Sequence, residues 1–250
     1  MADRRPAPAR RGGAAARRGR ARARARRVAA ERRQGGARPV NALITGGRGG
    51  LGQAFAAALG DADVTLLDLP EFDVGDPEAW RTLEGEFDAA FLNAGVSTGE
   101  TDIAALTDEQ YGRAVGANTD GVVFGTRELA ARLMPRGGSI VATASLAGLT
   151  ATPMDPIYAL TKHAVVGFVR SVAPQLAPRG IRINALCPGF TDTPIVDDEI
   201  RGALPAPLME PSFVAEAALQ ALGSEETGQA WVVQPNRILQ FRFPNIPGPR

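Results

Sequence analysis

From residue 40 onward, short apolar runs alternate with longer amphipathic segments, and this alternation constrains the fold more than any other feature of the chain. The strand candidates are residues 40–45, 63–68, 89–92, 139–144, 181–186 and 230–233. The helix candidates between them are residues 50–59, 77–83, 108–133, 156–175 and 211–222. Such alternation is typical of a parallel sheet with helices on both faces. The sequence therefore predicts one doubly wound α/β domain over residues 39–250, without a solenoid repeat.

The interval after the second strand departs from this rhythm. Only residues 69–71 separate the strand that ends at Asp68 from an extended-looking piece at residues 72–74. A parallel crossover needs about a dozen or more residues, so three residues cannot form one. We therefore expect that the sheet has lost a crossover helix here and has shortened or lost an edge strand.

The first 38 residues differ in composition from the rest of the chain. They hold fourteen arginines against Asp3 and Glu31, whereas the remainder carries 14 basic and 25 acidic side chains. A segment of mainly Arg, Ala and Gly cannot bury enough apolar surface to order itself. We expect residues 1–38 to be a disordered tail, either a solvated extension or the product of a start codon placed too far upstream. A basic arm on nucleic-acid phosphates is the alternative, which the acidic remainder of the chain disfavours.

Several protein classes are excluded by composition. No apolar run reaches the roughly 18 residues that a membrane span needs, so we expect no membrane-spanning segment. Cys187 is the only cysteine, which rules out an intrachain disulfide and favours a reducing cytoplasm. His163 is the only histidine, and one His with one Cys makes a zinc site unexpected. We expect no metal and interpret His163 as a structural or surface residue.

A glycine-rich turn joins the first strand to the first helix. Residues 45–52 read Thr-Gly-Gly-Arg-Gly-Gly-Leu-Gly. Glycines let the backbone turn sharply and approach a pyrophosphate, which the N-terminus of a helix attracts. In this strand, turn and helix context, the run predicts a dinucleotide site. The contributing residues are Gly46, Arg48, Gly50, Leu51 and Gly52.

Asp68 ends the second strand, sixteen residues past Gly52. A carboxylate there can accept hydrogen bonds from an adenosine ribose and repel a 2′-phosphate, which favours NAD. A turn carboxylate without a ligand is the alternative for Asp68. Arg48 leaves NADP open, because its guanidinium could reach a 2′-phosphate or stack over adenine.

The only lysine of the chain lies four residues after one of its two tyrosines. Tyr158 and Lys162 project from one face of a predicted helix. A nearby cation favours the phenolate and pulls the pKa of a tyrosine, ordinarily about 10, toward neutral pH. This suits proton transfer to or from an alcohol oxygen. An ordinary surface pair is the alternative, but the chain uses Arg at its 27 other cationic positions, which favours the chemical role.

Residues 40 to 233 resemble the short-chain dehydrogenase/reductase family, and six motifs in the family's order carry the resemblance. They are the glycine turn at Thr45, Gly46, Gly50 and Gly52, Asn-Ala-Gly at Asn93, Ala94 and Gly95, a helix asparagine at Asn118, a serine at Ser145, Tyr-x-x-x-Lys at Tyr158 and Lys162, and Pro-Gly at Pro188 and Gly189. The resemblance implies a Rossmann-like sheet. It also implies an oxidoreductase that transfers a hydride between NAD(P) and a secondary alcohol or ketone. The departures are the missing crossover, a short segment after Pro194 and the arginine tail.

The resemblance further implies individual roles. Tyr158 would be the general acid/base, Lys162 would lower its pKa and hold the nicotinamide ribose, and Ser145 would hydrogen-bond the substrate oxygen. Asn118 would help to hold a water that relays protons to Lys162. The other cofactor contacts would be Asp73 and Val74 at adenine, Asn93, Ala94 and Gly95 at the adenosine ribose, and Pro188, Gly189, Thr191 and Thr193 at the nicotinamide.

The sequence also leaves an alternative function open and bears on assembly. A protein that senses a dinucleotide or serves as a scaffold without turnover is the alternative function, and the complete set of four catalytic matches argues against it. Family members commonly pair through the helices that bear Asn118 and Tyr158, which implies a homodimer or homotetramer. Residues 195–211 would cover the pocket for a small alcohol or ketone. Residues 241–244 would complete a neighbour's pocket or a subunit contact.

Overall fold

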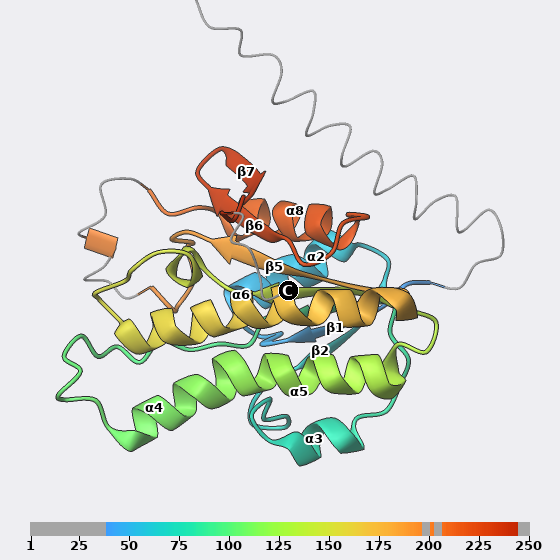
Figure 1. Ribbon diagram of the computed structural model, residues 1–250, viewed down its shortest axis with the longest axis horizontal. Coiled ribbons are helices and arrows are strands. Elements are labelled where there is room, and N and C mark those ends of the chain that lie inside the picture. Colours follow the sequence, from blue (N-terminus) through green and yellow to red (C-terminus); the bar gives the residue numbers. More distant parts are fainter. Residues whose placement is uncertain (1–38, 197–200, 203–206, 245–250) are drawn as a thin grey trace, which may run out of the picture. The chain divides into compact units, whose positions relative to one another are not determined.

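Seven strands in the described residues form one sheet, in the order β2-β1-β3-β4-β5-β6-β7, with helices on both faces (Figure 1). The structure is a computed structural model that describes residues 39–196, 201–202 and 207–244. The expected tail at residues 1–38 lies outside the described residues. The strands are β1 (Asn41–Thr45), β2 (Asp63–Leu67), β3 (Ala89–Leu92), β4 (Gly138–Thr143), β5 (Ile181–Pro188), β6 (Ala230–Gln234) and β7 (Arg237–Gln240).

The first six strands pair in parallel, as the sequence predicts, whereas β7 pairs antiparallel with β6. Gln234 faces Arg237 across a two-residue turn in which Asn236 has a φ of 60°. Asparagine tolerates this left-handed conformation better than most residues. Strand β7 is not predicted from the sequence, because it is only four residues long and has Arg and Gln at its ends.

Two layers of helices cover the sheet. Helices α2 (Gly50–Leu59) and α8 (Pro211–Leu222) lie on one face. The other face carries α3 (Pro77–Thr82), α4 (Asp108–Val115), α5 (Gly121–Glu128) and α6 (Pro156–Leu176) (Figure 1). Short 3₁₀ turns, η3 (Leu146–Gly148) and η4 (Ala177–Arg179), follow β4 and α6. The predicted doubly wound α/β fold is confirmed.

The helix predicted over residues 108–133 is continuous but contains two π-helical turns. They are η1 (Gly116–Asp120), between α4 and α5, and η2 (Leu129–Leu133), after α5. A π-turn inserts one extra residue into the hydrogen-bond ladder and is frequent at functional sites. The first of these turns contains Asn118, which is fully buried.

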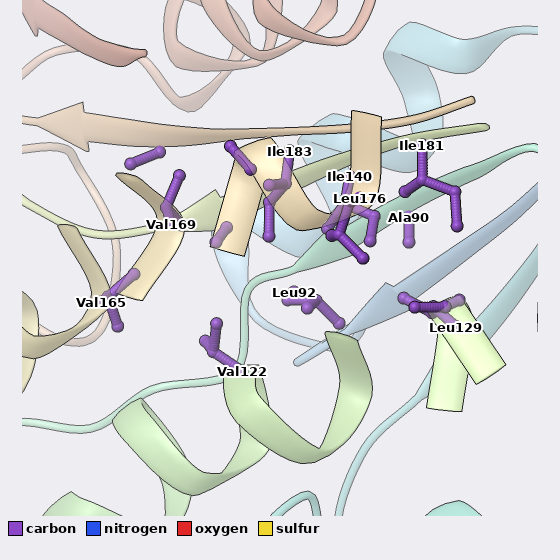
Figure 2. Packing of buried hydrophobic residues seen from close by; sticks show 14 of the residues in the cluster. Ala90, Leu92, Val122, Leu129, Ile140, Val165, Val169, Leu176, Ile181 and Ile183 are labelled. Atoms are coloured by element: carbon purple, nitrogen blue, oxygen red, sulfur yellow. The ribbon is translucent and has the colours of Figure 1, made fainter. Parts of the chain in front are cut away.

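Two apolar clusters hold the layers together. Figure 2 shows the cluster beneath α5 and α6, where Leu92, Ile140 and Ile183 from three adjacent strands meet Val122 and Val169 from the helices. The opposite cluster contains Phe55 and Phe91, whose rings stack with centroids 5.0 Å apart. Because the central strands are buried on both faces, only the sheet edges and strand ends remain for ligand contacts.

The expected loss of a crossover is confirmed in the described part of the chain. Strand β2 is the edge of the sheet, and residues 72–74 stay outside it. The indole N–H of Trp80 donates to the carbonyl of Val74 at 2.8 Å, and the rings of Phe72 and Trp80 meet edge to face. A loop and one buried tryptophan therefore cover the sheet face where a crossover helix would otherwise lie.

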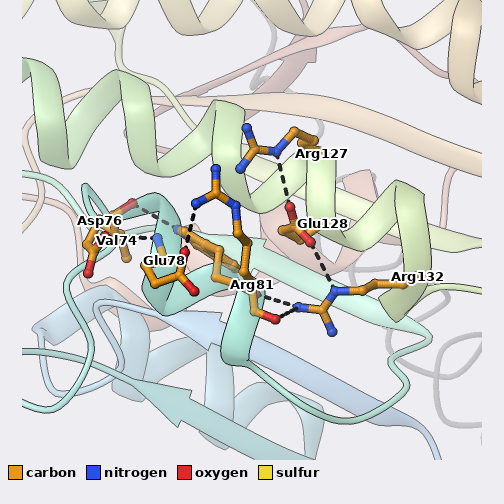
Figure 3. Close-up of polar contacts among 8 residues, drawn as sticks. Val74, Asp76, Glu78, Arg81, Arg127, Glu128 and Arg132 are labelled. Carbon is orange, nitrogen blue, oxygen red and sulfur yellow. Dashed lines mark hydrogen bonds and ion pairs between the residues drawn. The ribbon is translucent and has the colours of Figure 1, made fainter.

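An arginine on η2 fastens α3 to the long helix (Figure 3). The guanidinium of Arg132 donates to the carbonyls of Trp80, Arg81 and Leu83 at the end of α3. It also bonds Glu128 at 3.0 Å, and Glu128 in turn accepts from Arg127. Burial alone would raise the pKa of Glu128, but the two guanidinium groups outweigh burial and lower the pKa. This network fixes the C-terminal end of α3 against the long helix.

Candidate active site

The predicted site residues that follow or end a strand lie at the carboxyl end of the parallel strands, whereas Asn118 lies in η1 and Tyr158 and Lys162 lie in α6. The glycine turn follows β1, Asp68 follows β2, residues 93–95 follow β3, Ser145 follows β4, and Pro188 ends β5. Open parallel sheets bind their ligands at this edge. The structure thus brings the predicted site residues to one edge of the sheet.

The end of β1 is bonded directly to the end of β3. The hydroxyl of Thr45 accepts hydrogen bonds from the backbone N–H groups of Asn93 and Ala94, at 2.8 and 3.1 Å. Gly46 has a φ of +64°, and a Cβ there would lie 2.9 Å from the Cα of Ala94. Glycine is required at residue 46 for both reasons.

Helix α2 starts without a side chain over its N-terminus. Its N-cap is Gly49, and no side-chain hydrogen bond caps it. A Cβ on Gly50 would meet the methyl of Thr193 at 3.0 Å, which places Thr193 beside the turn. The side chain of Leu51 packs into the cluster under α2 and α8, so Leu51 offers the turn its backbone. The first N–H groups of α2 are therefore open to an anion.

Arg48 folds back over the end of β2. Its backbone N–H donates to Asp68 at 2.8 Å, its guanidinium donates to the carbonyl of Leu69 at 2.7 Å, and it pairs with Glu71 at 2.8 Å. The hydrogen bond between Arg48 and Glu71 raises the pKa of Arg48 and lowers the pKa of Glu71. From the sequence, the guanidinium of Arg48 could contact either a 2′-phosphate or adenine. In the structure it pairs with the carboxylate of Glu71 instead.

The two residues expected at adenine differ in their placement. The carboxylate of Asp73 accepts from the N–H of Gly75 at 2.8 Å and is exposed. Val74 is buried, and a Cβ on Gly121 of α5 would lie 2.7 Å from its Cγ2. The side chain of Val74 therefore belongs to the core.

A chain of hydrogen bonds links the lysine to the glycine turn. Lys162 Nζ donates to the carbonyl of Thr143 at 2.9 Å, and the hydroxyl of Thr143 donates to Asn93 Oδ1 at 3.2 Å. The amide of Asn93 reaches the carbonyl of Gly46 at 3.4 Å. Thr143 is not among the predicted site residues, although a polar residue at the end of an apolar strand, two positions before Ser145, is a usable signal.

Ser145 and Tyr158 lie together. The hydroxyl of Ser145 is near enough to the phenol of Tyr158 to lower its pKa. Ser145 Oγ also accepts from the N–H of Ala147 at 3.1 Å and lies 3.5 Å from the carbonyl oxygen of Pro188. The end of β5 thus lies next to the hydroxyl of Ser145.

The expected effect of Lys162 on Tyr158 is not found. Burial raises the pKa of Tyr158, the nearby hydroxyl of Ser145 lowers it, and the negative charge of Asp155 raises it further. Lys162 Nζ lies 5.4 Å from the ring centroid of Tyr158 and points to Thr143. The expectation was wrong for this structure, because burial outweighs a cation that does not bond the phenol oxygen.

Lys162 itself is almost completely buried. Burial lowers its pKa to about 8. The neighbouring thiol of Cys187 is also fully buried, and burial raises its pKa to about 12. Lys162 is therefore the group in this site that exchanges its proton nearest to neutral pH.

Lys162→Met is expected to remove a pH dependence of stability. Between the native pKa of about 8 and the ordinary 10.5, the unfolded chain keeps a proton that the native protein has released. The free energy of unfolding therefore rises with pH in this window. Below it, burial of the ammonium group costs about 3 kcal/mol. Near neutral pH, we expect the free energy of unfolding of Lys162→Met to exceed that of the native protein by about 1–3 kcal/mol. The variant should also lack the increase in this free energy toward about pH 9.5. An equal rise in both proteins would contradict the buried cation.

The amide of Asn118 joins the loop after β3 to α6. Asn118 Oδ1 accepts from the N–H of Val96 at 2.7 Å, and its Nδ2 donates to the carbonyl of Val96 and to the hydroxyl of Thr161. A Cβ on Gly95 would lie 2.9 Å from Asn118 Oδ1 and 3.2 Å from Lys162 Nζ. The side chain of Asn118 is thus fully engaged in anchoring, and the proton relay to Lys162 stays a prediction.

The loop after β5 bends back over the turn. The N–H of Gly189 donates to Val233, and the hydroxyls of Thr191 and Thr193 donate to the carbonyls of residues 189 and 191. Both threonines are buried. Of the expected pocket cover at residues 195–211, residues 197–200 and 203–206 lie outside the described residues.

Two further expectations concern the surface. His163 is exposed, and its Nδ1 lies 2.9 Å from the carbonyl of Ala159. Phe241 and Phe243 pack edge to face, and the guanidinium of Arg170 on α6 lies 3.7 Å from the ring centroid of Phe243. The C-terminal aromatic residues therefore contact their own chain.

The described residues contain no group of three metal-ligating side chains. In the same ranges, no helix is both long and apolar enough to cross a membrane.

The doubly wound sheet and the residues at its carboxyl edge define a Rossmann-like α/β protein. The chain belongs to the short-chain dehydrogenase/reductase family, since residues 13–233 match a family model described as enoyl-(acyl carrier protein) reductase. The chain is 32% identical over 221 residues to levodione reductase of Leifsonia aquatica, covering 75% of this chain and 82% of that protein. It is 29% identical over 185 residues to 3beta-hydroxysteroid dehydrogenase of Mediterraneibacter gnavus, covering 62% of this chain and 67% of that protein.

Solved structures agree with this assignment. A 3-oxoacyl-[acyl-carrier protein] reductase from Brucella melitensis with bound NAD is 30% identical, with a TM-score of 0.66 and coverage of 78% of this chain and 89% of the other. A 3-ketoacyl-(acyl-carrier-protein) reductase from the same organism, complexed with NADH, is 26% identical, with a TM-score of 0.70 and coverage of 78% and 96%.

Proposed function

We propose that this protein is a cytoplasmic oxidoreductase that transfers a hydride between NAD(P) and a secondary alcohol or ketone. The observation that carries the proposal is the arrangement of Ser145, Tyr158 and Lys162. A serine hydroxyl lies beside a phenol, and a buried ammonium group next to them is connected to the glycine turn. The relatives named above, an NAD-bound reductase among them, support the same chemistry.

The residues present fit a dinucleotide. The open N-terminus of α2 and the glycines before it leave room for a pyrophosphate, because Gly49 and Gly50 carry no side chain there. Asp68 accepts one backbone hydrogen bond on each carboxylate oxygen and retains further acceptor capacity for ribose hydroxyls. Residues 93–95 and 188–193 would hold the remainder of the molecule.

The residues of this chain divide the work of the reaction. When bound, the nicotinamide ring supplies or accepts the hydride. The phenol of Tyr158 donates a proton to the carbonyl oxygen of the substrate, and the hydroxyl of Ser145 donates a hydrogen bond to the same oxygen as charge develops. Lys162, with a pKa of about 8, holds a ribose hydroxyl and exchanges a proton near neutral pH. Asn118 keeps the loop after β3 in contact with α6.

The raised pKa of Tyr158 favours the reductive direction near neutral pH. A phenol that stays protonated is ready to act as an acid toward a ketone. Oxidation of an alcohol needs the phenolate, so its rate should increase as the pH rises. Burial is the main cause of the raised pKa.

A panel of ketones and secondary alcohols, assayed with NAD(H) and NADP(H) separately, tests the function. Cyclic compounds come first, because relatives of this chain are named for hydroxysteroids, levodione and borneol. We expect turnover of at least one compound, followed by the absorbance of the reduced nicotinamide. Tight dinucleotide binding without turnover of any compound would favour the alternative, a dinucleotide sensor or scaffold.

Asp68→Ser is expected to weaken a preference for NAD. Asp68 is half-buried just after β2, where its carboxylate would repel a 2′-phosphate, and Arg48 beside it is paired with Glu71. We expect the native protein to bind NAD more tightly than NADP, and the variant to gain about tenfold in affinity for NADP. Fluorescence titration gives both dissociation constants. Asp63→Ser, at the far end of the same strand, is the control for net charge. A native preference for NADP would refute this role of Asp68.

We also infer that the protein forms a homodimer or homotetramer. An apolar groove runs between α5 and α6 on their outer side, and Val123, Phe168 and Val172 are among its lining residues. Pairing through these helices would cover the groove. Sizing chromatography with light scattering should give at least twice the mass of the chain, and a monomer at micromolar concentration would contradict the inference.

A further inference from the structure

We propose that Glu71 helps to determine dinucleotide specificity, because it holds the guanidinium of Arg48 away from a 2′-phosphate and so disfavours NADP. The proposal rests on the function proposed above and adds a second determinant beside Asp68. Glu71 is not among the predicted site residues, since no local pattern in the sequence indicates that it meets Arg48 in the turn before α2.

The backbone of Arg48 is fixed beside Asp68, the carboxylate expected at the adenosine ribose. Its N–H donates to Asp68 Oδ2 at 2.8 Å, and its carbonyl accepts from the side-chain amide of Gln53 at 3.0 Å. A 2′-phosphate is attached to one of the ribose hydroxyls that Asp68 could bind, so it would lie close to both residues. Only the side chain of Arg48 can therefore exchange one partner for another.

That side chain is well suited to a phosphate. A guanidinium presents several N–H donors in a planar fork that matches phosphate oxygens. In this structure its Nη1 donates to the carbonyl of Leu69 at 2.7 Å, and its Nη2 pairs with Glu71 Oε2 at 2.8 Å. A 2′-phosphate must therefore compete with a carboxylate that already holds the same group.

The short turn after β2 places Glu71 next to Arg48. The N–H of Phe72 donates to the carbonyl of Asp68 at 3.0 Å, which closes residues 68–72 into one turn. The ring of Phe72 then packs edge to face on Trp80. A crossover helix would carry the chain away from Arg48 at this point. The loss of the crossover therefore supplies the carboxylate that pairs with the guanidinium.

The size of the effect follows from the exposure of the pair. The side chains of Arg48 and Glu71 are 60% and 64% exposed. An exposed ion pair changes an equilibrium constant by about fivefold at most. Asp68 repels a 2′-phosphate whether or not Glu71 is present. Removal of Glu71 should therefore reduce the preference for NAD without reversing it.

Four proteins test the proposal: the native chain, Glu71→Ala, Arg48→Gln and the double variant. Fluorescence of the reduced nicotinamide gives the dissociation constants for NADPH and NADH. We expect Glu71→Ala to bind NADPH about fivefold more tightly than the native protein does, and NADH within about twofold of native. In the Arg48→Gln background, Glu71→Ala should change NADPH affinity by less than about twofold, because no guanidinium is released.

Glu78→Ala is the matched control. Glu78 pairs with Arg81 at 2.7 Å, and this pair is exposed to a similar extent. Its replacement removes the same charge and should leave the ratio of the two dissociation constants unchanged. The proposal is overturned if Glu71→Ala does not gain affinity for NADPH. It is also overturned by equal gains with and without the guanidinium of Arg48, which would mean that Glu71 acts only through its own charge.

Two nucleotides without nicotinamide locate the effect. Adenosine 2′,5′-bisphosphate and 5′-AMP differ only in the 2′-phosphate, so calorimetric titration of Glu71→Ala should show a gain for the first and none for the second. A gain for both would assign the effect to a rearranged turn and overturn the proposal. Absence of binding by either dinucleotide would refute the proposed function together with this inference. Turnover with NADH but no gain for NADPH in Glu71→Ala would refute the role of Glu71 alone.

Discussion

Tyr158→Phe is expected to lower kcat/KM by about 10²–10⁴-fold, the usual contribution of a general acid. The substitution removes one oxygen from a partly buried ring and keeps the ring's packing. The substrate oxygen then loses its proton donor. Dinucleotide affinity should stay within about twofold of native, because the glycine turn and Asp68 are untouched.

Tyr111→Phe provides the control for this loss. Tyr111 lies on α4, is exposed and is the other tyrosine of the chain. The same atom is removed there, and turnover should not change. If Tyr158→Phe kept native turnover, the proton would have to come from another group, and the assignment of the acid would be wrong.

The positions of the motif residues could be predicted because they follow from backbone periodicity. Strand ends in a parallel sheet share one edge, and a four-residue spacing on a helix places two side chains on one face. These two rules suffice to place the glycine and Asn-Ala-Gly motifs at strand ends and to place Tyr158 and Lys162 on one helix face. The loss of a crossover could be predicted because the three residues 69–71 are too few to form one. These are local constraints, and the structure places each of these residues accordingly.

The electrostatics of the site could not be predicted in the same way. The pKa of Tyr158 depends on burial and on where Lys162 Nζ points, and neither quantity is visible in a four-residue spacing. The hydroxyl groups that donate to Asp155 lie 57 and 58 positions earlier in the chain, so no sequence window contains them. Arg48 likewise found Glu71 only because the shortened loop brings the end of β2 back toward the turn. Contacts between residues far apart in the sequence therefore determine the charge states in the site, whereas the local sequence pattern determines where the site residues lie.

Gly52→Ala is expected to damage both stability and dinucleotide binding. A Cβ at this buried position would lie 2.2 Å from the carbonyl oxygen of Gly46 and 2.8 Å from the Cα of Gly47. Both atoms are backbone, so no side chain can rotate away, and the turn must open or α2 must shift. We expect a loss of about 3 kcal/mol in the free energy of unfolding, the upper end for overpacking. Denaturant unfolding at constant pH measures this loss.

Gly112→Ala distinguishes this steric effect from a general effect of alanine in helices. Gly112 lies in α4, and a Cβ there would meet no atom within 4 Å. Its replacement should stabilise the protein by roughly 0.5–1 kcal/mol, because alanine loses less backbone entropy than glycine on folding. Gly52→Ala should also bind NADH at least about tenfold more weakly, since the N-terminus of α2 moves with the turn. Native affinity in a folded Gly52→Ala variant would show that the turn does not hold the pyrophosphate, and the dinucleotide site would have to be sought elsewhere along this edge of the sheet.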